Sequence, residues 1–96
     1  MSEFLVEIKI NLPADLDAED REALVAAELK RGKELVEAGS ISRIWRLPGR
    51  RANVGIWSAP DADALHAAIT TLPMFPYMDI EVTALATHPL EQDAPA

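Results

Sequence analysis

The sequence has no cysteine, which excludes disulfide bonds, thiolate catalysis and cysteine-ligated zinc. Aromatic residues make up only 5% of it, and no apolar run approaches the roughly 18 residues of a membrane span. Basic residues are also few, 9 against 16 acidic, so the net charge is −7. Because nucleic acids and anionic membranes bind through clustered Lys and Arg, we expect neither as a partner. A chain without cysteine fits the cytoplasm, where we expect this protein.

What remains is enough for one compact domain. The chain has 96 residues, of which 49% are hydrophobic, and a chain this short supports a single two-layer core. We expect one domain over residues 1–89 and a polar tail over 90–96. His66 and His88 are far apart in sequence and no acidic cluster accompanies them, so we predict no metal site. We find no cofactor motif and expect no cofactor.

The apolar pattern alternates between two periods along the chain. Period-two alternation predicts strands, and a repeat every three to four residues between capping signals predicts helices. The predicted helices start at Asp17 and at either Ser58 or Asp61. The predicted strands are 4–11, 41–47, 52–57 and 78–86, and the predicted helices end near residues 38 and 72.

This order, β-α-β-β-α-β, is typical of an α+β ferredoxin-like sandwich, with two helices on one face of a four-stranded antiparallel sheet. In the second strand we expect Ile41, Arg43, Trp45 and Leu47 to share a face. Such a fold leaves the second face of the sheet bare, so we expect a partner subunit to cover it. The sequence therefore predicts a homo-oligomer built from dimers.

One carboxylate interrupts the apolar stripe of the first predicted helix. At about 100° per residue, Glu28 falls between Leu24 and Val25 on the face expected to pack against the sheet. Gly32, one turn later, removes a side chain beside it. Two interpretations stay open: Glu28 reaches solvent or an arginine at the edge of the stripe, or it lines a small hollow, where burial would raise its pKa.

The turn before the third strand gathers polar groups. Arg50 and Arg51 can each bind a carboxylate through two hydrogen bonds, and Asn53 offers an amide donor for a developing enolate oxygen. Arg51 and Asn53 have the same parity, so both point to one face of a strand. The alternative is a solvated turn with an asparagine that satisfies backbone groups.

The segment Phe75-Pro76-Tyr77 is a rigid aromatic elbow. It either packs between helix and strand or forms an apolar wall of a substrate pocket. His66 is interpreted as a surface or boundary residue, and His88 as a packing or interface residue.

Several stretches of the chain carry a family resemblance. These are FLVEIKINLP at the start, the hairpin IWRLPGRRAN, the segment DADALHAAITTLPMFPYMDIEV and the ending ALATHP. From Phe4 to about Pro89 the chain resembles the muconolactone Δ-isomerase family, which includes the chloromuconolactone dehalogenases. The resemblance implies a ferredoxin-like fold, no cofactor, and a homo-oligomer that reaches a homodecamer.

The resemblance also implies the chemistry. Family members move a proton along a small anionic unsaturated lactone, converting muconolactone to 3-oxoadipate enol-lactone in aromatic catabolism. The family's catalytic glutamate falls on Glu28 and its hairpin asparagine on Asn53. Leu29 stands where family isomerases carry Lys, and Arg51 where they carry Tyr. We therefore expect Arg51 and Arg50 to bind substrate, with Phe75 and Tyr77 as pocket walls.

Two other functions stay open from the sequence. One is a non-catalytic ferredoxin-like oligomer that binds a ligand or a partner protein. The other is a divergent cofactor-free enzyme that acts on another small enone or lactone.

Overall fold

The computed structural model describes residues 1–92, and these form the predicted α+β sandwich. The expected element order is confirmed, with a 3₁₀ helix, η1, and a final helical turn, α3, added to it. In chain order the elements are β1 (Ser2–Ile10), α1 (Ala18–Glu37), β2 (Ile41–Arg46), β3 (Ala52–Ala59), α2 (Ala62–Ile69), η1 (Phe75–Tyr77), β4 (Met78–Leu85) and α3 (Pro89–Gln92).

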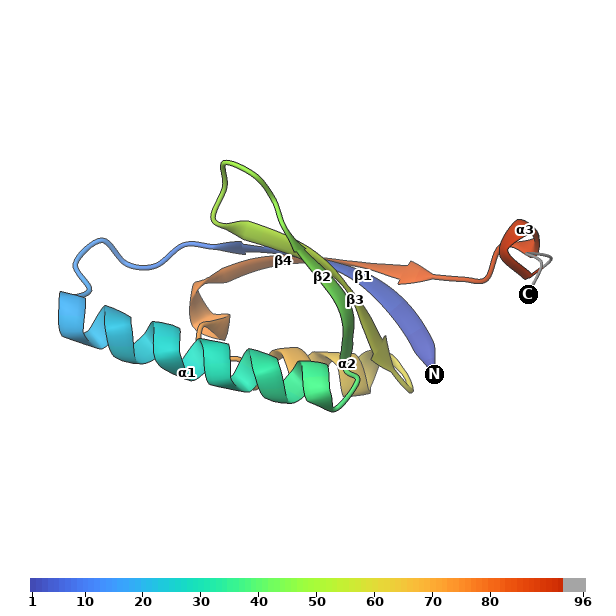
Figure 1. Cartoon of the computed structure of the whole chain (residues 1–96), viewed down its shortest axis with the longest axis horizontal. Coiled ribbons are helices and arrows are strands. Elements are labelled where there is room, and N and C mark those ends of the chain that lie inside the picture. The colour runs from blue at the N-terminus through green and yellow to red at the C-terminus, as the bar shows by residue number, and fades with distance from the viewer. Residues whose placement is uncertain (93–96) are drawn as a thin grey trace.

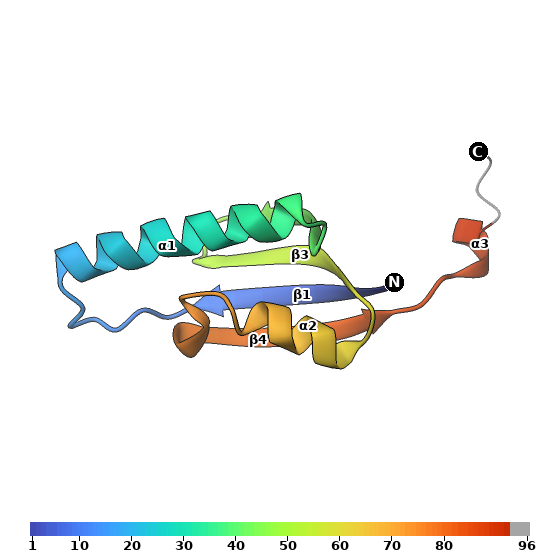
Figure 2. The same cartoon turned by 90° about the horizontal axis from the view of Figure 1, so that it is seen from below.

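The four strands form one sheet in the order β2-β3-β1-β4, and every neighbouring pair is antiparallel. The two long chain crossings place α1 and α2 on the same face of this sheet, as Figures 1 and 2 show from two directions. No helix of residues 1–92 covers the opposite face (Figure 2). The core therefore lies in a single layer between the sheet and the two helices.

The alternation of β1 builds this core. Phe4, Val6 and Ile8 are buried under the helices, and Phe4 lies directly opposite Trp57 of β3. Leu35 of α1 and the apolar side of α2 close the layer from below. The inward side chains of β1 lie at the centre of the sheet, so this strand holds both halves of the fold together.

Side chains of the sequence set the helix ends. Asp17 caps α1 by accepting a hydrogen bond from the amide of Asp20 (2.8 Å), and Asp61, rather than Ser58, caps α2 in the same way. The helix α2 ends at Ile69, earlier than expected. The hydroxyls of Thr70 and Thr71 donate to carbonyls of the last turn, and Pro73, which has no N–H, cannot continue the helix.

A β-bulge in β2 overturns the expected face of that strand. Ile41 pairs with Trp57, but after the irregularity Ile44 pairs with Gly55, so one extra residue enters β2. Ile41 and Ile44 therefore face the helices, while Arg43 and Trp45 face the bare side, where the guanidinium lies 4.8 Å above the indole ring. The prediction that Ile41, Arg43, Trp45 and Leu47 share one face was wrong.

The apolar stripe of α1 is also divided. Its side around Leu24, Glu28 and Leu35 packs toward the sheet, and Leu35 is fully buried. Its other side stays exposed: the exposed fraction is 47% for Val25, 60% for Leu29 and 50% for Val36. The packed face is thus narrower than the apolar stripe, and Glu28 lies near the middle of it.

The first residues of the predicted polar tail are helical. Beyond β4 the residues Pro89–Gln92 form the turn α3, in which the amide of Leu90 donates to Nδ1 of His88 at 3.0 Å. Figure 1 shows this turn standing away from the sandwich. The remaining part of the predicted tail, residues 93–96, lies outside the described residues.

Candidate active site

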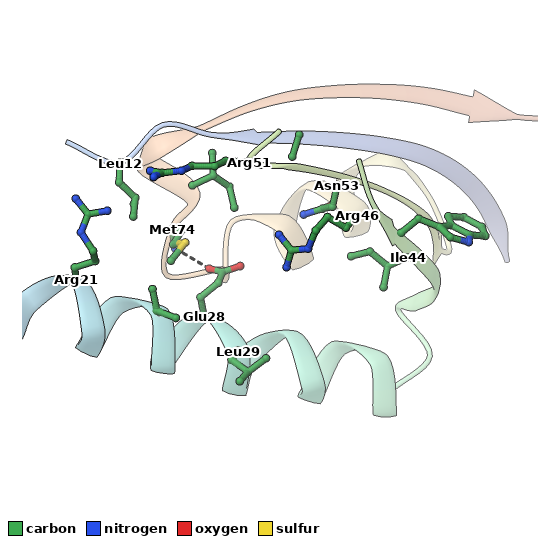
Figure 3. A pocket seen from close by; sticks show the side chains of 13 residues that line it. Leu12, Arg21, Glu28, Leu29, Ile44, Arg46, Arg51, Asn53 and Met74 are labelled. Atoms are coloured by element: carbon green, nitrogen blue, oxygen red, sulfur yellow. Dashed lines mark hydrogen bonds between the residues drawn. The ribbon is translucent and has the colours of Figure 1, made fainter. Parts of the chain in front are cut away.

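A cavity of about 630 Å³ opens between α1 and the helix-covered face of the sheet. Its wall takes side chains from α1, from β2, from the start of β3, from the end of β1 and from the segment before η1 (Figure 3). The predicted hollow with Glu28 in its wall is confirmed. Gly32 is not part of it: it does not line the cavity, and a Cβ at this position would meet nothing within 4 Å.

Glu28 points from α1 into this cavity. Its Oε1 accepts a hydrogen bond of 2.9 Å from the backbone amide of Met74. Partial burial raises the pKa of Glu28 above its ordinary value of 4.5, and the Met74 N–H opposes this rise because it stabilises the ionised carboxylate. The proton affinity of Glu28 is thus increased by burial, and the Met74 amide limits the increase.

Asn53 enters the cavity from the sheet side, opposite Glu28 (Figure 3). In the register of the sheet it lies between Ile8 of β1 and Arg46 of β2, on the helix-covered face. Its Oδ1 is buried and has no hydrogen-bond partner among the described residues. Buried amide oxygens normally have a hydrogen-bond partner. The Oδ1 of Asn53 therefore takes no part in the hydrogen bonds that hold residues 1–92 together.

Three guanidinium groups surround the single carboxylate. Arg21, Arg46 and Arg51 line the cavity, and among the described residues Glu28 is the only acid in its wall. On a chain whose net charge is −7, this concentrates positive charge at one place. Low-dielectric walls focus such a field, so the cavity attracts small anions that the rest of the surface repels.

The comparisons with known proteins agree with this geometry. The family model described as muconolactone delta-isomerase matches residues 2–91. The chain belongs to the muconolactone Δ-isomerase family. Among its relatives, the muconolactone Δ-isomerase of Pseudomonas aeruginosa is 41% identical, with 90% of each chain covered. The muconolactone Δ-isomerase 2 of Acinetobacter lwoffii is 40% identical, with 88% covered in each. A crystal structure of muconolactone isomerase superposes with a TM-score of 0.85 at 38% identity, covering 91% of both chains.

Two of the positions at which the resemblance implies a departure from the family pattern, Leu29 and Arg51, lie at this cavity, whereas a third, Ile41 in place of Trp, is buried in the core. Leu29, which stands where the muconolactone Δ-isomerase pattern has Lys, lines it with an apolar side chain. Arg51, which replaces Tyr, brings a guanidinium to the opposite wall (Figure 3). Position 29, next to Glu28 on α1, is therefore uncharged, and Arg51 supplies a positive charge just before β3.

Three predicted substrate-binding residues lie elsewhere. Arg50 lines a second, smaller cavity of about 360 Å³ that is shared with Glu7 and Lys9. Phe75 packs against the core with its ring edge-to-face to His66, 6.4 Å between centroids. Tyr77 is not in the wall of the larger cavity. That these three residues bind substrate stays a prediction, although none of them lines the larger cavity in the single chain.

Sequence reasoning missed three contributors to the site: Arg46, Arg21 and the amide of Met74. Regular alternation of β2 would place Arg46 on the bare face, and only the bulge turns it inward. Arg21 is one of several charges on the long helix, with no pattern that distinguishes it. A backbone donor leaves no trace in the residue type.

The described residues lack two further features. Within 1–92, no group of three or more His, Asp or Glu side chains is close enough to hold a metal ion. In the same part of the chain, none of the helices is both long and apolar enough to cross a membrane.

Proposed function

We propose that this protein is a muconolactone Δ-isomerase, which transfers a proton within a small anionic unsaturated lactone. The observation that carries the proposal is the isolation of Glu28. Within residues 1–92 it is the only acid in the wall of a cavity that also holds Asn53 and three arginines. Membership of the family supports the same reaction.

In this reaction Glu28 acts as base and then as acid. Its carboxylate removes a proton from the ring carbon next to the lactone oxygen, and the electron pair moves through the C=C bond to give a dienolate. The protonated Glu28 then returns the proton two carbons away, beside the carbonyl. The lactone gains and loses one proton, so a single carboxylate suffices and no other reactant is consumed.

The sheet side of the cavity supplies the charge stabilisation. The amide of Asn53 donates to the carbonyl oxygen that becomes the dienolate, and Arg46 lies beside it on the neighbouring strand. Arg51 binds the carboxylate of the substrate, in place of the Tyr that the family pattern has there. The dienolate carries two negative charges. A cavity rich in guanidinium groups therefore stabilises it better than an uncharged protein environment would.

The hydrogen bond from Met74 sets the strength of the base. Burial alone would raise the pKa of Glu28 and leave more of it protonated, whereas the amide stabilises the carboxylate. A base whose pKa lies nearer the working pH both accepts and returns a proton efficiently.

The decisive experiment is an absorbance assay of the purified protein with muconolactone, with Glu28→Gln as the test variant. We expect wild-type protein to turn over the lactone and Glu28→Gln to lose about 10²–10⁴-fold in kcat, as is typical when a general base is removed. Glu22→Gln, on an exposed position of the same helix, is the matched control and should keep full activity. Near-full turnover by Glu28→Gln would contradict the assignment.

The proposal extends to the setting of the enzyme. We propose that it works in the cytoplasm as a homo-oligomer, on a small anionic lactone as its partner molecule. The cysteine-free sequence supports the first part, and the apolar side chains left exposed on α1, β2 and β4 support the second.

A further inference from the structure

The segment between α2 and β4 is fastened to α1 at two neighbouring points. The amide of Met74 donates to Oε1 of Glu28 at 2.9 Å, and Nε of Arg31 donates to Oγ1 of Thr71 at 2.8 Å. Glu28 and Arg31 are three residues apart on one helix, and so lie side by side on its surface. Thr71 and Met74 are likewise three apart, so the two bonds run from one helix face to one short stretch of chain.

The polarity of the second contact is fixed. The Thr71 hydroxyl has one proton, which it donates to the carbonyl of Ala68 at 2.6 Å, so a lone pair is left for Arg31. On its other side the guanidinium of Arg31 forms an ion pair with Glu34, 3.1 Å between Nη1 and Oε1. The guanidinium is therefore held between the carboxylate of Glu34 and the hydroxyl of Thr71. Because the guanidinium is planar and rigid, these two contacts fix its orientation.

We propose that Arg31 is a positioning residue: by holding Thr71 it keeps the Met74 amide aimed at Glu28 and thereby orients the carboxylate toward the cavity. Arg31 itself does not line the cavity, so it acts on the reaction only through this contact. The inference rests on the proposed role of Glu28 as the base.

The charges around Glu28 make the effect measurable. Arg21 and Arg31 lie on α1, Arg46 lies on β2, and Arg51 lies just before β3. Residues 70–74 carry no ionisable side chain. Arginines keep their charge at every working pH. The contribution to the pKa of Glu28 that can change is the hydrogen bond from the Met74 amide. When its hydrogen bond weakens, the carboxylate loses a donor and Glu28 holds its proton to a higher pH.

The first test follows the titration of the Glu28 carboxyl carbon by NMR in full-length protein labelled with ¹³C-glutamate, the signal being assigned from its loss in Glu28→Gln. In Thr71→Val the Arg31 contact is removed without a change of charge, and we expect the midpoint to move to higher pH. Arg31→Met should show at least the same shift, and Thr71→Ser, which keeps the hydroxyl, should restore the wild-type midpoint. Lys30→Met removes a charge from the same helix without touching the contact, and so measures the purely electrostatic part.

The second test is the pH profile of turnover with muconolactone. We expect kcat of Thr71→Val to fall about tenfold, within the roughly 10²-fold loss that a 1 Å misplacement produces, with KM little changed. The acid limb of kcat should move to higher pH by the same amount as the NMR midpoint. Unchanged midpoint and unchanged limb in both Thr71→Val and Arg31→Met, with only a lower Tm, would overturn the proposal and leave Arg31 as a structural tie. Because the NMR titration uses no substrate, it decides on Arg31 even if Glu28→Gln were to retain full turnover.

Discussion

Glu28 occupies a position where an ionised group is disfavoured. Burial raises its pKa, so the folded protein binds a proton at this site more readily than the unfolded chain does. The folded state is therefore favoured at low pH and loses that advantage as the pH rises through the folded pKa. At neutral pH the ionised carboxylate destabilises the fold that the reaction depends on.

We accordingly predict that Glu28→Gln raises the Tm at neutral pH while it abolishes turnover. The gain should shrink as the pH falls through the raised folded pKa and be absent below pH 4.5, the ordinary pKa of the side chain, because the wild-type residue is then neutral in both the folded and the unfolded state. Differential scanning calorimetry of both proteins between pH 4 and 8 measures this. A variant that is less stable than wild type at neutral pH would show that Glu28 is held mainly by favourable contacts.

Arg51 and Arg50 give a second prediction at the residue scale, because Arg51 lines both cavities whereas Arg50 lines only the smaller one. Arg51→Met should lower kcat/KM about 10–150-fold, the equivalent of the roughly 1.5–3 kcal/mol of a charge-assisted hydrogen bond. Arg50→Met is the matched control and should leave the rate unchanged. Steady-state kinetics, with light scattering to verify the assembly, distinguishes them, and equal losses in both variants would indicate a general effect of surface charge.

At the scale of elements, the regular parts of the fold could be predicted and the irregular part could not. Alternation in β1 and the caps Asp17 and Asp61 indicate their elements directly, because each signal is local. The bulge in β2 depends on the pairing with β3, which is not local. One inserted residue moved Trp45 out of the core and Arg46 into the site. Glu28 was found because it interrupts an apolar stripe, and Asn53 because it follows the polar turn before the third strand, whereas the Met74 amide gives no such signal.

The glycines of the two elements beside the site predict opposite effects of one substitution. A Cβ at Gly55 would lie 2.8 Å from the carbonyl oxygen of Arg43, so Gly55→Ala must push β2 and β3 apart at the bulge. We expect a loss of about 1–3 kcal/mol. At Gly32, in the open middle of α1, alanine should instead stabilise by about 0.5–1 kcal/mol. Urea unfolding of both variants tests the pair, and a Gly55→Ala protein as stable as wild type would refute the close approach.

At the scale of the whole molecule, apolar side chains remain uncovered in two places. One set lies on α1 and β2, and the other follows β4 into the projecting arm. They are Val25, Leu29, Val36, Ile44 and Trp45 in the first set, and Val82, Leu85 and Leu90 in the second. A chain of 10.5 kDa that leaves this much apolar surface in water is expected to associate.

We predict that light scattering gives a mass that is a multiple of 10.5 kDa, up to ten chains by the family resemblance. Leu90 is 78% exposed in the single chain, so Leu90→Asp should reduce the mass without unfolding the domain. The neighbouring exposed substitution Glu91→Gln is the control. A monomer at micromolar concentration in the wild-type protein would refute the prediction.

The donor that meets Glu28 is a main-chain amide, and every amino acid except proline carries one. A substitution at position 74 therefore changes the side chain in the cavity wall and leaves the donor in place. The shape of the pocket and the basicity of Glu28 are therefore separable at this position. A lineage of such enzymes is free to try larger or smaller lactones at this position, one mutation at a time, without having to evolve a new base.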